Sequence, residues 1–250
     1  PFSVGAPGEY DMNRLFWPAA YISAVVFAGA ALVRPAAADD AQLRAGVKRA
    51  IERAQDFLIS QQLPDGSWSK ERPGVSAIVV LALANSGLEA NHPTIEKGLK
   101  YLRGAGVPDN TYDNSLMIMA LTAVREGKRD AGLVFRLAQR LEANQKASGG
   151  WHYTSSSQGW DNSCTQYALL GLREAAHVAG YKVDQSTWRK ARDHWLREQV
   201  GSRDSVTGAG WQYSTTHSRS PTGSMTVAGI GSLAIIDAFL ADDPPDGELD

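Results

Sequence analysis

The sequence predicts an all-α protein built from helical hairpins, and three observations lead to that prediction. From Ala41 onward, apolar residues recur three or four positions apart, which is typical of helices, while strand-like alternation is almost missing. Glycine and proline concentrate between the periodic segments, where they favour helix ends and loops. The segments also repeat in pairs of about forty to fifty residues, a length typical of stacked helical hairpins.

Eight helices in four pairs are expected. The first begins after Ala41 and carries the apolar stripe Val47, Ile51, Ala54 and Leu58. The others are predicted, in order, over residues 75–86, 94–102, 113–126, 131–144, 161–179, 185–199 and 224–240. Their ends follow from local signals: proline precedes the third helix, and a glycine follows each of the second, fourth and sixth.

The composition is that of an ordinary globular chain. Of its 250 residues 43% are hydrophobic and 21% are charged, and the net charge is −2. Lysine and arginine are scattered without a basic run, so nucleic acid is not an expected partner. Cys164 is the only cysteine, so no internal disulfide holds the chain and its stability must come from core packing.

The first 38 residues are expected to precede the folded domain. Met12 opens a segment that resembles a secretory signal peptide, with Arg14 at its start, apolar residues 15–33, and alanines at 36–38 as a cleavage site. Residues 1–11 are then upstream of the true start. An uncleaved membrane anchor is the alternative, and no other segment is expected to be apolar enough to span a membrane. In both cases the domain at 39–241 is exported, periplasmic or secreted, and a polar tail follows at 242–250.

One motif recurs with identical spacing. Two copies read Leu-x3-Gln-x3-Gly-x-Trp, a fourth-pair copy contains an insertion, and the second pair lacks both Gln and Trp. The Gln and Trp of each copy are Gln62 with Trp68, Gln145 with Trp151, and Gln199 with Trp211. Because a ligand-specific tryptophan would have no reason to recur in this way, we expect a structural role. The amide would satisfy backbone groups at a helix end, and the indole would pack over that end.

The second helices of the pairs also align. Tyr112-Asp113-Asn114-Ser115 matches Trp160-Asp161-Asn162-Ser163, and Ser76 and Ser224 are expected at the equivalent place. A polar residue before an apolar run is typical of a helix N-cap, where a side-chain oxygen accepts backbone N–H groups.

The repeated motif, placed behind an aromatic-leucine pair, resembles the QW repeat of squalene and oxidosqualene cyclases. The hairpins are also similar to those of protein prenyltransferase β subunits. That superfamily folds as an α/α toroid, a double ring of helices around an apolar cavity. The resemblance, which covers residues 41–240, implies that the first helices form an outer ring and the second helices an inner ring. A full toroid has about six hairpins, and with four the implied ring is incomplete.

The resemblance leaves three classes of activity open. The first is binding of an apolar, isoprenoid-like ligand or a protein partner, with Met117, Trp151, Trp160 and Tyr167 as the expected ligand residues. The second is catalysis of the terpene cyclase or prenyltransferase type, in which Asp113 and Asp161 would be the acids, although the Asp-x-Asp-Asp motif of the cyclases is missing. The third is a carbohydrate-active α/α barrel, with sugars stacked on the Gly-Trp-x-Tyr loops at 150–154 and 210–214.

No cofactor is expected, and a zinc site is the alternative that the prenyltransferase resemblance implies. It would use Asp161, Cys164 and His217, but this chain has Asp-x2-Cys where the family has Asp-x-Cys. Cys164 is better explained as a small buried hydrophobic residue. A thioester is excluded, because Cys164-Thr165-Gln166 has the wrong spacing.

Overall fold

A computed structural model describes residues 37–124, 127–201, 208–214 and 220–241, and within these residues the protein is all-helical. This confirms the predicted fold class. The predicted signal peptide up to residue 36, the tail at 242–250 and His217 lie outside the described residues. The helices are α1 (Ala37–Ser60), α2 (Pro73–Asn85), α3 (Pro93–Gly104), α4 (Thr111–Ala123), the short 3₁₀ helix η2 (Gly127–Asp130), α5 (Ala131–Ala143), α6 (Asn162–Ala179), α7 (Gln185–Arg197) and α8 (Gly223–Ala241).

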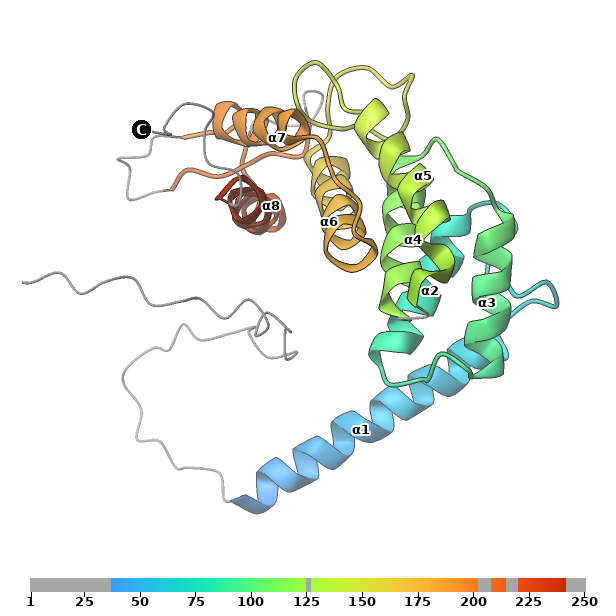
Figure 1. Ribbon diagram of the computed structural model, residues 1–250. Helices are drawn as coiled ribbons and strands as arrows, with labels where there is room; N and C mark the ends of the chain where they lie inside the picture. Colours follow the sequence, from blue (N-terminus) through green and yellow to red (C-terminus); the bar gives the residue numbers. More distant parts are fainter. Residues whose placement is uncertain (1–36, 125–126, 202–207, 215–219, 242–250) are drawn as a thin grey trace, which may run out of the picture. The chain divides into compact units, whose positions relative to one another are not determined.

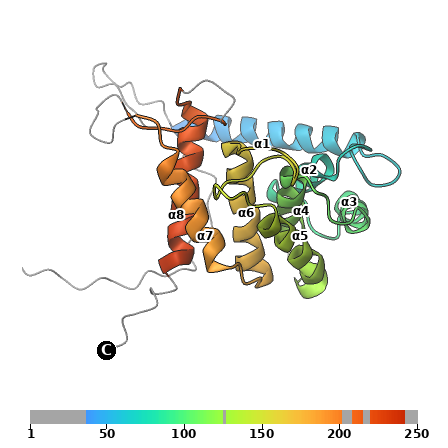
Figure 2. The same ribbon diagram turned by 90° about the horizontal axis from the view of Figure 1, so that it is seen from above.

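The chain divides into two compact units, and their boundary falls inside α1, between Ala45 and Gly46. Described residues of the first unit are 37–45, the beginning of α1. Within the second unit, α4 packs against α2 and α6, and α6 packs against α8 (Figure 1). Of the remaining helices, α3 packs on α2, α5 on α4 and α6, and α7 on α8 (Figure 2). The second helices of the four predicted pairs are therefore consecutive neighbours.

Capping and turn residues explain where several helices begin and end. The Asn110 side chain accepts hydrogen bonds from the first turn of α4, and Asp161 accepts one from the Cys164 N–H at the start of α6. Pro93 occupies the first turn of α3, where its missing N–H costs nothing. Gly180 ends α6 in the left-handed conformation with φ 74°.

The even-numbered helices differ in how much they bury. Nearly all of α4 is buried, including Met117 and Ile118. In contrast, α8 exposes 70% of Val227 and 60% of Ile230. By length and composition α8 is apolar enough to cross a membrane, although a core helix passes the same test. The expectation that only the N-terminal segment has that character is therefore wrong.

The recurring glutamine and tryptophan join consecutive hairpins through the same hydrogen bonds in two repeats. The Gln62 amide donates to the carbonyl oxygens of Gly66 and Thr94, each at 3.0 Å. The Gln145 amide donates to Gly149 at 2.9 Å and Thr187 at 3.0 Å. Each glutamine thus binds its own loop and the first turn of the next odd-numbered helix. We call this pair of bonds the glutamine clip.

The tryptophan of each motif copy is held at both its indole and its backbone. The indole N–H groups of Trp68, Trp151 and Trp211 donate to the carbonyl oxygens of Leu58, Leu141 and Trp195, each at 2.7 Å. Their backbone N–H groups donate to the hydroxyls of Ser76, Thr165 and Thr226. Thr226 is therefore the counterpart of Ser76, and the predicted match with Ser224 is wrong by two residues.

The hydrogen bonds also correct the predicted match between the second and third pairs. Thr111 donates from its backbone N–H to Tyr153 O, just as Asn162 donates to Tyr213 O. Asn110 and Asp161, the residues before them, are the two N-caps. Asp113, which lies three residues after Asn110, is therefore not the counterpart of Asp161. The predicted alignment is therefore shifted by three residues, which is nearly one helical turn. Because such a shift keeps apolar residues on the same side of the helix, the sequence alone does not reveal it.

A buried histidine makes the stability of this fold depend on pH. His194 is fully buried on α7, and its Nε2 lies 2.8 Å from Asn162 Oδ1. Burial, with a smaller contribution from the Arg197 charge, lowers the pKa of His194 to about 3. Below pH 6.5 the unfolded chain binds a proton that the folded protein excludes. The stability present above pH 6.5 is therefore lost as the pH falls toward 3.

We expect the free energy of unfolding to fall by up to about 1.4 kcal/mol per pH unit below pH 6.5 because of this one residue. Urea unfolding at a series of pH values measures the slope. His194→Gln should reduce the slope, whereas His177→Gln, which changes an exposed histidine, should not. Equal slopes in His194→Gln and the unchanged protein would contradict the assignment.

Candidate functional site

Three tyrosines gather where α4 and α6 begin. The Tyr112 ring lies 4.4 Å from the Tyr167 ring between centroids, and it stacks on the Tyr153 ring at 5.9 Å. Tyr112 comes from the first turn of α4, Tyr167 from the second turn of α6, and Tyr153 from the loop after Trp151. Thr111 fixes that loop by donating from its hydroxyl to the His152 carbonyl oxygen at 2.6 Å. We call these three residues the tyrosine cluster.

Two hydroxyls in this cluster, those of Tyr112 and Tyr153, remain protonated. Burial raises the pKa of Tyr112 well above its ordinary range, and the Asp161 charge raises it further against a hydrogen bond with Ser163. Burial and the Asp161 charge also raise the pKa of Tyr153. Each phenol can therefore both donate and accept a hydrogen bond. The cluster offers flat apolar rings together with neutral hydroxyls.

Neither predicted acid is placed as a proton donor. The Asp113 carboxylate accepts hydrogen bonds from Arg72, from Nη2 at 2.9 Å and from Nε at 3.3 Å. Asp161 accepts from the Cys164 N–H at 3.0 Å and from the Ser163 hydroxyl. The carboxylate oxygens of both residues are therefore already bound by partners within the fold. Asp113 joins α2 to α4, and Asp161 caps α6.

The predicted zinc ligands are only partly described. Asp161 and Cys164 share the first turn of α6, His217 lies outside the described residues, and no group of three or more His, Cys, Asp or Glu side chains suited to a metal occurs within them. Cys164 is buried, and this burial, followed by the Asp161 charge, raises the pKa of the Cys164 thiol well above its usual range. The protonated thiol is a poor metal ligand.

We expect Cys164 to react with a disulfide reagent such as 5,5′-dithiobis(2-nitrobenzoic acid) at least about 100-fold more slowly in the native protein than after unfolding. The reason is that the buried thiol is both inaccessible and protonated. Absorbance of the released thiolate measures the rate, and protein in guanidinium chloride is the control. Rapid stoichiometric labelling of native protein would place an accessible thiolate at this position.

The four predicted ligand residues separate into two groups. Met117 and Trp151 are fully buried, and Trp160 is nearly so, packing edge-on against His194. Only Tyr167 reaches the surface, as a member of the tyrosine cluster. Tyr153 lies in the loop at 150–154 that was expected to offer aromatic faces. Tyr112 opens the Tyr-Asp-Asn-Ser motif at 112–115 but was not among the expected ligand residues.

Beyond the tyrosine cluster, the neighbouring helices α2, α4 and α6 each have exposed or partly exposed apolar residues. On α2, Val75 and Ile78 are exposed and one turn apart. On α4, Met119 is partly exposed and lies two turns after Tyr112. On α6, Leu170 is partly exposed and lies one turn after Tyr167. The Tyr112–Tyr167 contact shows that the stripes of α4 and α6 adjoin. We call the side marked by these residues the apolar face.

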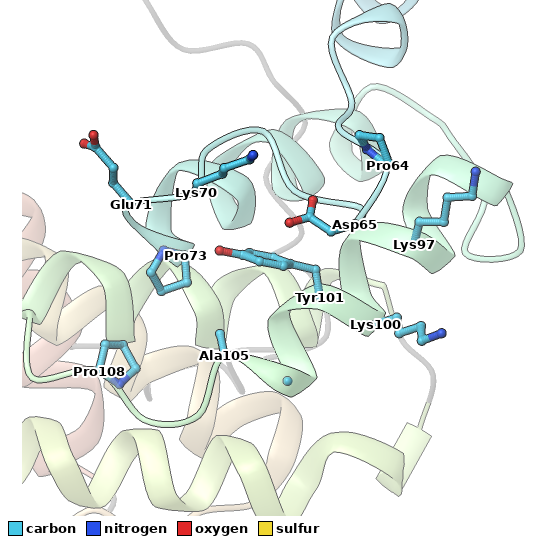
Figure 3. Close-up of a pocket in the computed structure, with 11 residues that line it drawn as sticks. Pro64, Asp65, Lys70, Glu71, Pro73, Lys97, Lys100, Tyr101, Ala105 and Pro108 are labelled. Carbon is cyan, nitrogen blue, oxygen red and sulfur yellow. The ribbon is translucent and has the colours of Figure 1, made fainter.

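A separate open pocket lies by the loop between α1 and α2, and five of the eleven residues that line it are charged. Figure 3 shows the Tyr101 ring at its centre between Asp65 and Pro73, with Lys97 and Lys100 pointing away from it. The Tyr101 hydroxyl is 3.4 Å from the Ser69 carbonyl oxygen, and burial raises the pKa of that phenol. None of the predicted site residues lines this pocket. The sequence contains no motif that marked it.

A scan against models of protein families finds no family that matches this chain, and a search of curated protein sequences finds no match either.

Proposed function

We propose that the protein is an exported domain of the α/α-toroid type that binds an apolar, isoprenoid-like ligand on the apolar face. The observation that carries this proposal is the exposed pair Val75 and Ile78 on α2, together with the partly exposed Met119 and Leu170 on the neighbouring helices α4 and α6. Exposed apolar side chains that gather on one surface are costly in water and commonly mark binding sites. The recurring glutamine clip supports the toroid-type repeat.

The tyrosine cluster suits the polar end of such a ligand. Its rings extend the apolar surface, and its protonated hydroxyls can donate to an alcohol or ether oxygen. The apolar body would then lie along α4 and α6 toward Met119 and Leu170. Small-molecule sites commonly combine this kind of apolar lining with a few polar groups that fix orientation.

Binding is better supported than catalysis by a cyclase, a prenyltransferase or a glycosidase. An acid that protonates carbon or a glycosidic oxygen must hold its proton near neutral pH. Asp113 is paired with Arg72, and Asp161 caps a helix, so the oxygens of both carboxylates already bind partners within the fold. Their roles in helix packing and capping account for their presence.

The test is binding of farnesol and squalene to the purified chain, followed by intrinsic fluorescence and calorimetry, together with mass spectrometry of lipid extracted from the protein. We expect an apolar compound to copurify and a model isoprenoid to bind. Ile78→Glu should weaken binding by at least about 10-fold, since a charge must then be desolvated at the site. An oligosaccharide is the second probe and should not bind.

Leu196→Glu is the matched control, because Ile78 and Leu196 are both 44% exposed and Leu196 lies on α7, away from the apolar face. It should bind the isoprenoid as the unchanged protein does. Circular dichroism verifies that both variants are folded. No isoprenoid binding at all, or equal binding by Ile78→Glu, would overturn the proposal, and binding of the oligosaccharide alone would favour the carbohydrate alternative.

A further inference from the structure

The fourth repeat contains a glutamine clip residue without its acceptor. Gln62 lies four residues after Leu58, whose carbonyl holds the Trp68 indole, and Gln145 lies four after Leu141. Gln199 has the same place, four residues after Trp195, whose carbonyl holds the Trp211 indole. Among the described residues, however, the Gln199 amide has no hydrogen-bond partner. The first turn of a further odd-numbered helix is what the other two clips bind.

The adjacent helix α8 has an unpartnered apolar face. Its buried residues, among them Met225, Ala228 and Ile236, face the side where α6 and α7 pack. Val227 and Ile230 lie on the opposite side and are its most exposed large residues. Among the even-numbered helices, α4 packs between α2 and α6, and α6 packs between α4 and α8. Within the described chain, α8 has only α6 as an even-numbered neighbour. Two large exposed apolar residues on the side of α8 away from α6 and α7 favour a docking site there.

Helix α1 lacks a preceding even-numbered helix among the described residues, and α8 of another copy could take that place. Thr94 and Thr187, the clip acceptors, lie eight residues before Leu102 and Trp195. The same count from Leu58 leads to Ala50, which lies in the middle of α1 and not in its first turn, and no described residue donates a clip to it. Val47 and Ile51 flank that position on one side of α1 and are 52% and 42% exposed. In the repeat pattern, α1 corresponds to the helix that would follow α8.

We propose that α8 of one copy of this chain binds α1 of a second copy, in a head-to-tail interface. The Gln199 amide would donate to the Ala50 carbonyl of the second copy, whose oxygen has a second lone pair free for a shared bond. Val227 and Ile230 would be covered by Val47 and Ile51. Because the two contacting surfaces differ, each copy keeps one α1 and one α8 available, and such an interface extends to rings or chains.

Two double variants of the full chain test this inference through the oligomeric state, measured by light scattering after size-exclusion chromatography. The α8 variant carries Val227→Glu with Ile230→Glu, and the α1 variant carries Val47→Glu with Ile51→Glu. We expect the unchanged protein to associate with increasing concentration and each variant alone to be a monomer. An equimolar mixture of the two variants should form a dimer and nothing larger, because one intact α8 meets one intact α1.

The remaining controls separate this interface from others. Leu196→Glu should associate as the unchanged protein does, and Gln199→Ala should associate roughly fivefold more weakly. Circular dichroism and thermal melting verify that each variant is folded. A mixture of folded variants that stays monomeric would overturn the proposal, as would one variant that assembles normally alone. An unchanged protein that remains monomeric and binds phosphatidylcholine vesicles would instead assign the α8 face to a membrane.

Discussion

Replacing Trp151 by alanine is expected to lower the free energy of unfolding by about 3–5 kcal/mol, the usual cost of deleting a large buried aromatic side chain. Trp151 is fully buried. The substitution removes its indole from the core and leaves the Leu141 carbonyl without the hydrogen bond that it accepts at 2.7 Å. The cavity and the unsatisfied carbonyl both contribute to the loss.

Trp68→Ala is the comparison within the same molecule. Trp68 makes the same indole bond, to Leu58, but its ring is partly exposed, so the loss should be smaller. Urea unfolding followed by circular dichroism measures both variants. Because these tryptophans lie in the hairpin joints, isoprenoid binding by the folded fraction should be unchanged. Equal losses in the two variants, or a loss of binding in a folded Trp68→Ala protein, would contradict a purely structural role.

Gly149→Ala is expected to be comparably damaging, lowering the free energy of unfolding by more than about 3 kcal/mol. Gly149 has φ 86°, a conformation that side chains rarely adopt. A Cβ atom there would lie 2.0 Å from the Lys190 carbonyl oxygen of α7, so the loop or the helix would have to move. The same movement would break the Gln145 clip, whose two acceptors belong to that loop and that helix.

Gly180→Ala separates the two contributions. Gly180 also has a positive φ, 74°, but a Cβ atom there would meet nothing within 4 Å. It should lose only the backbone preference, about 1–2 kcal/mol. Thermal and urea unfolding of the two variants provide the measurement. A Gly149→Ala protein no less stable than Gly180→Ala would show that the loop does not press on α7 as described.

Helix positions could be predicted from this sequence because several helices are bounded by a local signal. Pro93 and Gly180 mark ends that the structure places at α3 and α6. The alignment of repeats was less reliable. Asp113 was matched to Asp161 because both precede Asn-Ser, but the chain places Asn110 at the cap. The loops that precede α4 and α6 differ in length, so the sequence does not show the three-residue shift between Asn110 and Asp113. The hydrogen bonds at the two helix starts show it.

The candidate site was predictable only in part, for a physical reason. The helices α4 and α8 are apolar nearly all round, so no periodicity tells which of their sides lacks a neighbour. Met117 was expected to meet a ligand and is buried, whereas Ile230 on α8 is 60% exposed. Which side is covered depends on the helices packed around each one. That information is in the tertiary contacts and not in the local sequence.

The glutamine clips have a consequence for how the protein opens. Each clip reaches only the next odd-numbered helix, so its contribution to stability couples nearest neighbours along the chain. The central helix α4 packs between α2 and α6, while α8, among the described helices, packs against α6 and α7 only. Amide hydrogens should therefore exchange slowest in α4 and α6 and sooner in α8, as the row loses order from its end. Mass-resolved exchange would show this gradient directly, and the gradient would flatten in any assembly that covers α8.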